Sequence, residues 1–235
     1  MDFLKEGLKQ ICLADKTAAL FIEPRIAEIT ELLVRYVNET ERFNSVYGLV
    51  KADNRDTLIV KHILDSIAPL GHIIELFGRD ATRDGCKGFP AKIAADIGSG
   101  AGLPGIPLAI CLPHLCITLI ERMGRRAGFL RNTCAVLAAM PGGLKNILVD
   151  ETELEKARGS FDLIVFRALS SLTPDFTAKL FRLCKPGGII AAYKGKHDTA
   201  KAELAGLSRQ LFTTELIPVT VPFLDEERCL AAIKS

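Results

Sequence analysis

The feature that most constrains the fold is a glycine-rich segment between a short apolar run and a helix-like stretch. Glycines follow Asp96 at every second position, at Gly98, Gly100 and Gly102, and Pro104 comes shortly after. Glycine lets the backbone bend sharply and approach a ligand closely, and proline suits a first helical turn, whose N–H groups are unpaired. A strand, a glycine turn and a helix in this order predict a site for a nucleotide-like ligand.

The composition indicates a globular protein without a dominant charge. The chain has 235 residues, of which 49% are hydrophobic and 25% charged, and its net charge is only +2. A nucleic-acid partner would therefore have to bind a local basic patch. We expect a cytoplasmic protein, because residues 1–6 carry charges and no uninterrupted apolar run approaches the ~20 residues of a membrane span.

The cysteines and histidines do not predict a disulfide framework or a metal site. The seven cysteines are odd in number, several lie in apolar runs, and none forms a Cys-x-x-Cys pair. This pattern favours reduced, mostly buried thiols. His72, His114 and His197 show no ligand spacing with one another, so we expect no metal.

The pattern of apolar residues along the chain changes near residues 78–90. Apolar residues recur at helical spacing through residues 1–40 and again from 58 to 77. Glycines, a proline and charges gather in 78–90, which marks a boundary. We predict a helical amino-terminal region over 1–90 and a ligand-binding domain over 91–235.

The second region alternates short apolar runs with longer helical segments. This order predicts a mostly parallel sheet with helices on both faces. The last two runs are separated by only a short loop, which predicts an antiparallel hairpin at the end. The seven predicted strands are 93–97, 116–120, 146–149, 162–166, 189–193, 215–219 and 229–233.

The glycine turn fits two ligand classes. Gly100, Gly102 and Gly105 fit the dinucleotide fingerprint, whereas Asp96 followed by the alternate glycines fits the turn of class I S-adenosylmethionine-dependent methyltransferases. The methyltransferase pattern is favoured, because in the dinucleotide fingerprint the first glycine should directly follow the strand. A carboxylate at the strand end also suits the ammonium group of S-adenosylmethionine.

Two later segments agree with the methyltransferase pattern. Glu121 ends the second apolar run, where a carboxylate accepts hydrogen bonds from a ribose in either ligand class; the alternative is an ordinary solvated glutamate. The segment 185–188, Lys-Pro-Gly-Gly, predicts a helix end and a tight turn before the fifth strand. We predict an α/β fold of the class I S-adenosylmethionine-dependent methyltransferases: a Rossmann-like, mostly parallel seven-stranded sheet with a C-terminal antiparallel hairpin and a helical N-terminal extension.

Most of the chain resembles the RsmG (GidB, glucose-inhibited division protein B) family. The residues that carry the resemblance are Phe43-Asn44, 62–66, 96–108, Arg125-Arg126, Phe129-Leu130, Arg167-Ala168, 185–188, Lys194-Gly195 and 228–230. The resemblance implies a 16S rRNA guanine-N7 methyltransferase that takes a methyl group from S-adenosylmethionine to a guanine of the 530 loop. It implies as partner 16S rRNA or the small ribosomal subunit, and a monomer is the simplest expectation.

The resemblance also implies the cofactor contacts. Arg167 is in addition a candidate for positioning the substrate or transition state. The candidate cofactor-binding residues, with the glycine turn included, are Asp96, Gly98, Ser99, Gly100, Gly102, Leu103, Glu121, Thr152, Glu153 and Arg167.

A basic cluster near the same strand ends is the candidate RNA surface, because clustered cations engage phosphates. The alternative is that the helical arginines form a solvated face. The candidates are Arg122, Arg125, Arg126, Arg131, Lys194 and Lys196.

The chain departs from the family pattern at two places, and two further features leave alternatives. Gly48-Leu49-Val50 stands where Asn-Leu-Thr is usual, and Glu151 where arginine is frequent. Tyr193 is either a buried strand residue, which is favoured, or a face for stacking a base. His62 and Asp65 are spaced for one helix face and are interpreted as a hydrogen-bonded structural pair in preference to a substrate wall.

The implied chemistry needs no covalent intermediate. Guanine N7 is already a nucleophile at neutral pH, so the enzyme acts by positioning. The Pro-Cys of 5-methylcytosine enzymes and the Asn-Pro-Pro-Tyr of amino methylation are both missing from the sequence. The remaining alternatives are a small-molecule methyltransferase on this fold and an inactive RNA- or nucleotide-binding module.

Overall fold

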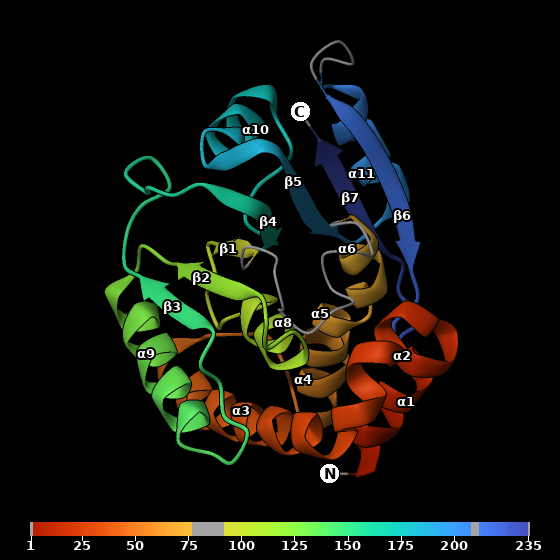
Figure 1. The fold of residues 1–235 in the computed structure, drawn as a ribbon, viewed down its shortest axis with the longest axis vertical. Coiled ribbons are helices and arrows are strands. Elements are labelled where there is room, and N and C mark those ends of the chain that lie inside the picture. Colours follow the sequence, from red (N-terminus) through yellow and green to blue (C-terminus); the bar gives the residue numbers. More distant parts are fainter. Residues whose placement is uncertain (1, 77–91, 208–211, 235) are drawn as a thin grey trace.

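A seven-stranded sheet forms the centre of the computed structural model, which describes residues 2–76, 92–207 and 212–234 (Figure 1). The strand order is β3-β2-β1-β4-β5-β7-β6. The first five strands pair in parallel, and β7 runs antiparallel to both of its neighbours. The strands are β1 (Ile93–Ile97), β2 (Cys116–Ile120), β3 (Ile147–Asp150), β4 (Phe161–Arg167), β5 (Cys184–Lys194), β6 (Thr213–Val219) and β7 (Arg228–Lys234). The predicted fold class is confirmed.

Strand β5 begins earlier than predicted. Cys184 already pairs with Phe161, and the next pair joins Ile189 to Leu163, so the intervening Lys-Pro-Gly-Gly segment is an irregularity inside the paired strand. Gly187 has a φ of 74°, which only glycine adopts readily. The prediction of a turn ahead of the strand was wrong because pairing with β4 starts before the turn.

Residues 2–76 are mostly helical, as predicted, and the predicted boundary at 78–90 lies outside the described residues. The stretch from residue 58, whose apolar residues have helical spacing, is helical but irregular: it contains a π-helical segment, and Pro69, which has no N–H to donate, precedes the last helix. The elements are α1 (Asp2–Ala14), α2 (Lys16–Ile22), η1 (Glu23–Arg25), α3 (Ile26–Tyr47), α4 (Arg55–Leu58), the π-helical η2 (Ile59–Leu64), α5 (Asp65–Ile67) and α6 (Leu70–Leu76).

The two faces of the sheet bury two separate hydrophobic clusters. Along β4, Leu163 and Val165 face one cluster, while Ile164 and Phe166 face the other, as the period of a strand requires. The first face is covered by the amino-terminal helices, α8 (Gly105–Cys111) and α9 (Gly124–Ala138). The second is covered by α10 (Pro174–Phe181) and α11 (His197–Ala205).

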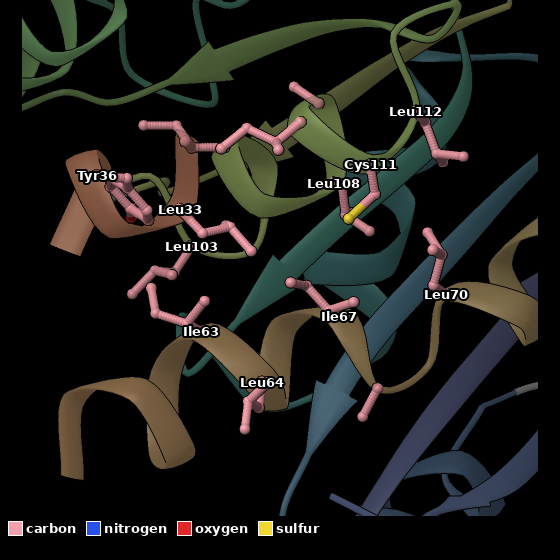
Figure 2. Close-up of a cluster of buried hydrophobic side chains, with 14 of the residues drawn as sticks. Leu33, Tyr36, Ile63, Leu64, Ile67, Leu70, Leu103, Leu108, Cys111 and Leu112 are labelled. Atoms are coloured by element: carbon pink, nitrogen blue, oxygen red, sulfur yellow. The ribbon is translucent and has the colours of Figure 1, made fainter. Parts of the chain in front are cut away.

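The amino-terminal helices share a core with the sheet domain. Figure 2 shows Leu33 and Tyr36 of α3, with Ile63 of η2, gathered around Leu103, which follows the glycine turn. Tyr36 is fully buried, and its hydroxyl donates to the Ala101 carbonyl at 2.7 Å. One side of the glycine turn is therefore held by α3, a helix of the amino-terminal region.

The segment Arg55–Leu76 is long and apolar enough to cross a membrane, but 78% of its most apolar window is buried inside the protein. Ile63, Ile67 and Leu70 pack into the shared core (Figure 2). Its apolar character is explained by packing against α8 and α3.

We expect Tyr36→Phe to destabilise the protein by about 1–3 kcal/mol, because the buried Ala101 carbonyl loses its donor. Urea unfolding followed by circular dichroism measures the change. Tyr47→Phe is the matched control, since the Tyr47 hydroxyl makes no hydrogen bond among the described residues. Equal unfolding midpoints for the two variants would contradict the role of Tyr36.

Candidate active site

The glycine turn has the backbone that its sequence predicts. Gly98, Gly100 and Gly102 have φ values of 67°, 60° and 92°, in the left-handed region that favours glycine. A Cβ on Gly98 would lie 2.5 Å from Leu169, and one on Gly102 would lie 2.4 Å from Ile106. At Gly100 the nearest heavy atom would be 3.8 Å away, so this part of the turn leaves room beside its backbone.

Asp96 at the end of β1 is fully buried and holds the turn with one oxygen. Its Oδ2 accepts hydrogen bonds from the Ser99 hydroxyl at 2.7 Å and from the Gly105 N–H at 3.0 Å. Its Oδ1 has no partner within the described ranges. Burial raises the pKa of the Asp96 carboxyl to about 6. A buried oxygen without a donor suits a ligand that brings one.

Glu121 follows β2 and holds the turn with one oxygen and the start of α9 with the other. Oε2 accepts from the Gly100 N–H and Oε1 from the Met123 N–H, each at 2.9 Å. The side chain is only 4% exposed. The alternative of an ordinary solvated glutamate is therefore wrong, because two backbone donors replace the water.

A cavity of about 520 Å³ opens at the carboxyl ends of β1, β2 and β3. It brings together four of the predicted cofactor residues, from three separate segments: Gly98, Glu121, Thr152 and Glu153. Other predicted residues, Asp96, Ser99, Gly100, Gly102 and Leu103, lie in or behind the turn and do not line this cavity. Its remaining lining residues are Ile120, Arg122, Met123, Arg126, Leu154, Glu155 and Leu169.

Arg167 lies elsewhere, in a second cavity of about 460 Å³ between β4, β5, β7 and the η2–α5 segment. Ala168 lines the second cavity and Leu169 lines the first, so the end of β4 separates the two. Ala168 has a φ of 52°, a strained value for a residue with a Cβ. Such strain is found most often at functional sites.

His62 and Asp65 both bind Arg167. The Arg167 Nη1 donates to Asp65 Oδ2 at 2.7 Å, and Nη2 donates to His62 Nδ1 at 2.9 Å. No hydrogen bond in the described structure joins His62 to Asp65, so the predicted direct pair was wrong. The spacing of His62 and Asp65 along the helix does not indicate their common partner, because Arg167 is 105 residues from His62 in the sequence.

The hydrogen bonds of His62 assign its tautomer. Nε2 lies 3.1 Å from the Lys51 carbonyl oxygen, which only accepts, so Nε2 carries the proton and Nδ1 accepts from Arg167. Burial and the adjacent Arg167 charge lower the pKa of His62. The imidazole is therefore neutral near pH 7.

The six candidate RNA-binding residues fall into two groups. Arg131 forms an ion pair with Glu151 at 2.8 Å, and Lys194 forms one with Glu203 at 2.6 Å. The departure at Glu151 is thus balanced by a nearby arginine. The other four make no ion pair within the described residues, and Arg122 and Arg126 line the first cavity. These four are Arg122, Arg125, Arg126 and Lys196.

Three further residues of the site were not predicted from the sequence or were left open. Tyr193 is a buried strand residue whose hydroxyl donates to the Ser66 carbonyl at 2.9 Å, and burial raises its pKa. Tyr36 and Arg228 were not singled out as site residues. No local spacing identifies them, because their partners are distant in sequence. The described residues contain no group of three His, Cys, Asp or Glu side chains arranged to hold a metal.

A family model described as rRNA small subunit methyltransferase G (GidB) matches residues 29–231 of this chain. The match covers well over half of the sequence and includes both cavities. The chain belongs to the GidB family.

Curated members of this family are similar over nearly their whole length. The chain is 37% identical over 225 residues to the ribosomal RNA small subunit methyltransferase G of Treponema pallidum (strain Nichols), covering 94% of this chain and 92% of that protein. It is 31% identical over 249 residues to the protein of the same name from Treponema denticola, with 98% and 93% covered.

Solved methyltransferases share the fold of this GidB family member. A putative caffeoyl-CoA O-methyltransferase from Staphylococcus aureus aligns with a TM-score of 0.54 at 13% identity, covering 94% of this chain and 100% of that one. The magnesium protoporphyrin IX methyltransferase of Synechocystis, solved with bound SAM, aligns with a TM-score of 0.53 at 15% identity, covering 83% and 90%. At these identities the likeness concerns the fold alone.

We expect Asp96→Asn to change how stability depends on pH. The folded-state pKa of Asp96, about 6, is above the 3.8 of a free aspartate, so the favourable contribution of Asp96 to stability is lost as pH rises from about 4 toward 6. The free energy of unfolding of the variant, relative to that of the native protein, should rise by on the order of 2 kcal/mol between about pH 4.5 and about pH 7.5. Urea unfolding at the two pH values measures this. Asp53→Asn, at an exposed position, is the control. A difference that stays constant with pH would refute the assignment.

Proposed function

We propose that this protein transfers a methyl group from S-adenosylmethionine to N7 of a guanine in the 16S rRNA of the small ribosomal subunit. The GidB family match over residues 29–231 carries the proposal. The cavity beside the glycine turn supports it, because that cavity lies where α/β folds of this type bind their ligands.

The first cavity and the glycine turn beside it together fit S-adenosylmethionine. The buried Asp96 Oδ1, which lacks a donor, suits the ammonium of the methionine end. Glu121, Thr152 and Glu153 supply polar atoms for the adenosine end, and the room beside Gly100 allows close approach to the backbone. When bound, the cofactor supplies a methyl group on a positively charged sulfur.

The protein's own residues act by orienting the guanine that accepts the methyl group. Guanine N7 carries a lone pair at neutral pH, so no side chain has to remove a proton from it. The arrangement of His62 agrees with this, because its Nδ1 accepts from Arg167 and is not free to act as a base. Arg167, held by Asp65 and His62 beside the wall between the cavities, is placed to orient the acceptor.

A small-molecule methyltransferase and an inactive binding module are the alternatives. The four basic side chains without ion pairs in the described structure favour a polyanionic substrate over a small one. The intact carboxylates Asp96 and Glu121 favour an active enzyme. A substrate inside the small subunit implies a cytoplasmic location, and we propose a monomer that needs no metal.

Radiolabelled methyl transfer tests the proposed function. Purified protein is incubated with S-adenosylmethionine labelled in the methyl group and either naked 16S rRNA or small subunits from cells that lack the enzyme. We expect label at N7 of one guanine, because the proposed site for the methyl donor lies beside a basic surface. Cofactor binding by calorimetry without transfer to either substrate would overturn the enzyme assignment.

The two groups of basic residues should differ in RNA binding. We expect Arg122→Gln and Arg125→Gln each to weaken binding to small subunits a few-fold and to reduce the salt dependence by about one phosphate contact. Arg131→Gln, on the same helix as Arg125, is the matched control, because the charge of Arg131 is already paired with Glu151. Filter binding at several salt concentrations measures both quantities. An equal effect of all three variants would contradict the grouping.

A further inference from the structure

The second cavity contains more positive than negative charge. Its lining includes five cations, Lys51, Lys61, Arg167, Lys194 and Arg228, and one carboxylate, Asp65. Glu226 and Glu203, which lie outside the lining, pair with Lys61 and Lys194. Positive charge therefore remains in excess, which favours an anionic ligand.

Asp65 is shared by two guanidinium groups. Its Oδ2 accepts from Arg167 Nη1 at 2.7 Å, and its Oδ1 accepts from Arg228 Nε at 2.9 Å. The aspartate is 5% exposed, and both of its oxygens are occupied. It is thus placed to orient the two arginines.

Each guanidinium keeps donors for a ligand. A guanidinium has five N–H groups. Arg228 uses one on Nε, one on Nη1 toward the Glu227 carbonyl and one on Nη2 toward Glu226. One N–H group on Nη1 and one on Nη2 of Arg228 are left without a partner among the described residues, and a guanidinium that lines a cavity suits phosphate oxygens.

The position of Arg228 separates it from the cofactor cavity. The strand order β1-β4-β5-β7 places β7 two strands beyond β4, which is about 10 Å at the usual spacing. The first cavity ends at the wall formed by Ala168 and Leu169. The cofactor site proposed above includes no residue of β7, so the free donors of Arg228 face a different ligand.

We propose that Arg228, oriented by Asp65, binds a phosphate of the RNA strand next to the methylated guanine. This inference rests on the proposed function and adds the acceptor side of the same site. Phosphate is favoured because the substrate is a polyanion and because the excess of cations in the cavity matches its charge. Arg228 then anchors the strand, while Arg167, on the other oxygen of Asp65, lies closer to the cofactor.

Arg228→Gln tests the inference, with binding and catalysis measured separately. We expect the Kd and KM for unmodified small subunits to rise about tenfold. The slope of log Kd against log salt should fall by about 0.7, the value for one phosphate contact on a single strand. The calorimetric Kd for S-adenosylmethionine should stay unchanged. Lys145→Gln is the matched control, since Lys145 is exposed near the opposite end of the sheet.

Arg228→Lys keeps the charge but removes the planar pair of donors, so a smaller rise in Kd is expected. It also keeps the test valid if Arg228→Gln does not fold, which thermal unfolding reveals. Unchanged RNA affinity and salt slope in folded Arg228 variants would overturn the inference, as would weaker cofactor binding with normal RNA binding. Failure of the proposed function is a distinct result: the native protein itself would transfer no methyl group.

Discussion

The site depends on two buried carboxylates, Asp96 and Glu121, that hold the glycine turn and the helix start after it by accepting backbone N–H groups. In the glycine turn the N–H of Gly98 donates to the Ile120 carbonyl and that of Gly102 to the Ser99 carbonyl, whereas the N–H of Gly100 depends on a side-chain acceptor. Asp96 receives the N–H of Gly105, and Glu121 receives that of Gly100. Because these carboxylates follow adjacent strands of a rigid sheet, the turn is held on both sides. A buried carboxylate is tolerated here since backbone and hydroxyl donors replace its water.

The amino-terminal helices complete this arrangement from the other side. Tyr36 binds the carbonyl of Ala101 inside the turn, and the η2–α5 segment supplies His62 and Asp65 to Arg167. The helices also bury one face of the sheet in a shared core. The parts that would bind cofactor and substrate are therefore positioned by interactions between residues up to 163 positions apart. Destabilising the helices should affect the site as well as the fold.

Much of the fold could be predicted from the sequence because it depends on local periodicity. Short apolar runs between helical segments located all seven strands, with β5 alone beginning well before its predicted start. The segment before β5 was mistaken because a Lys-Pro-Gly-Gly run predicts a turn equally well before a strand or within one. The interruptions of the helical stretch after residue 58 were missed, since a π-helical segment keeps nearly the same apolar pattern as an α-helix.

By itself the sequence determined the fold class, the glycine turn and the carboxylates beside it, because neighbouring residues form that unit. Only the tertiary structure decided where the long polar side chains reach. It showed that Arg167 belongs to a second cavity, that His62 and Asp65 hold it, and that Arg228 shares Asp65. The physical reason is that a buried charge takes whichever partner the packing of distant elements brings within hydrogen-bond distance, and no spacing along the chain records that choice.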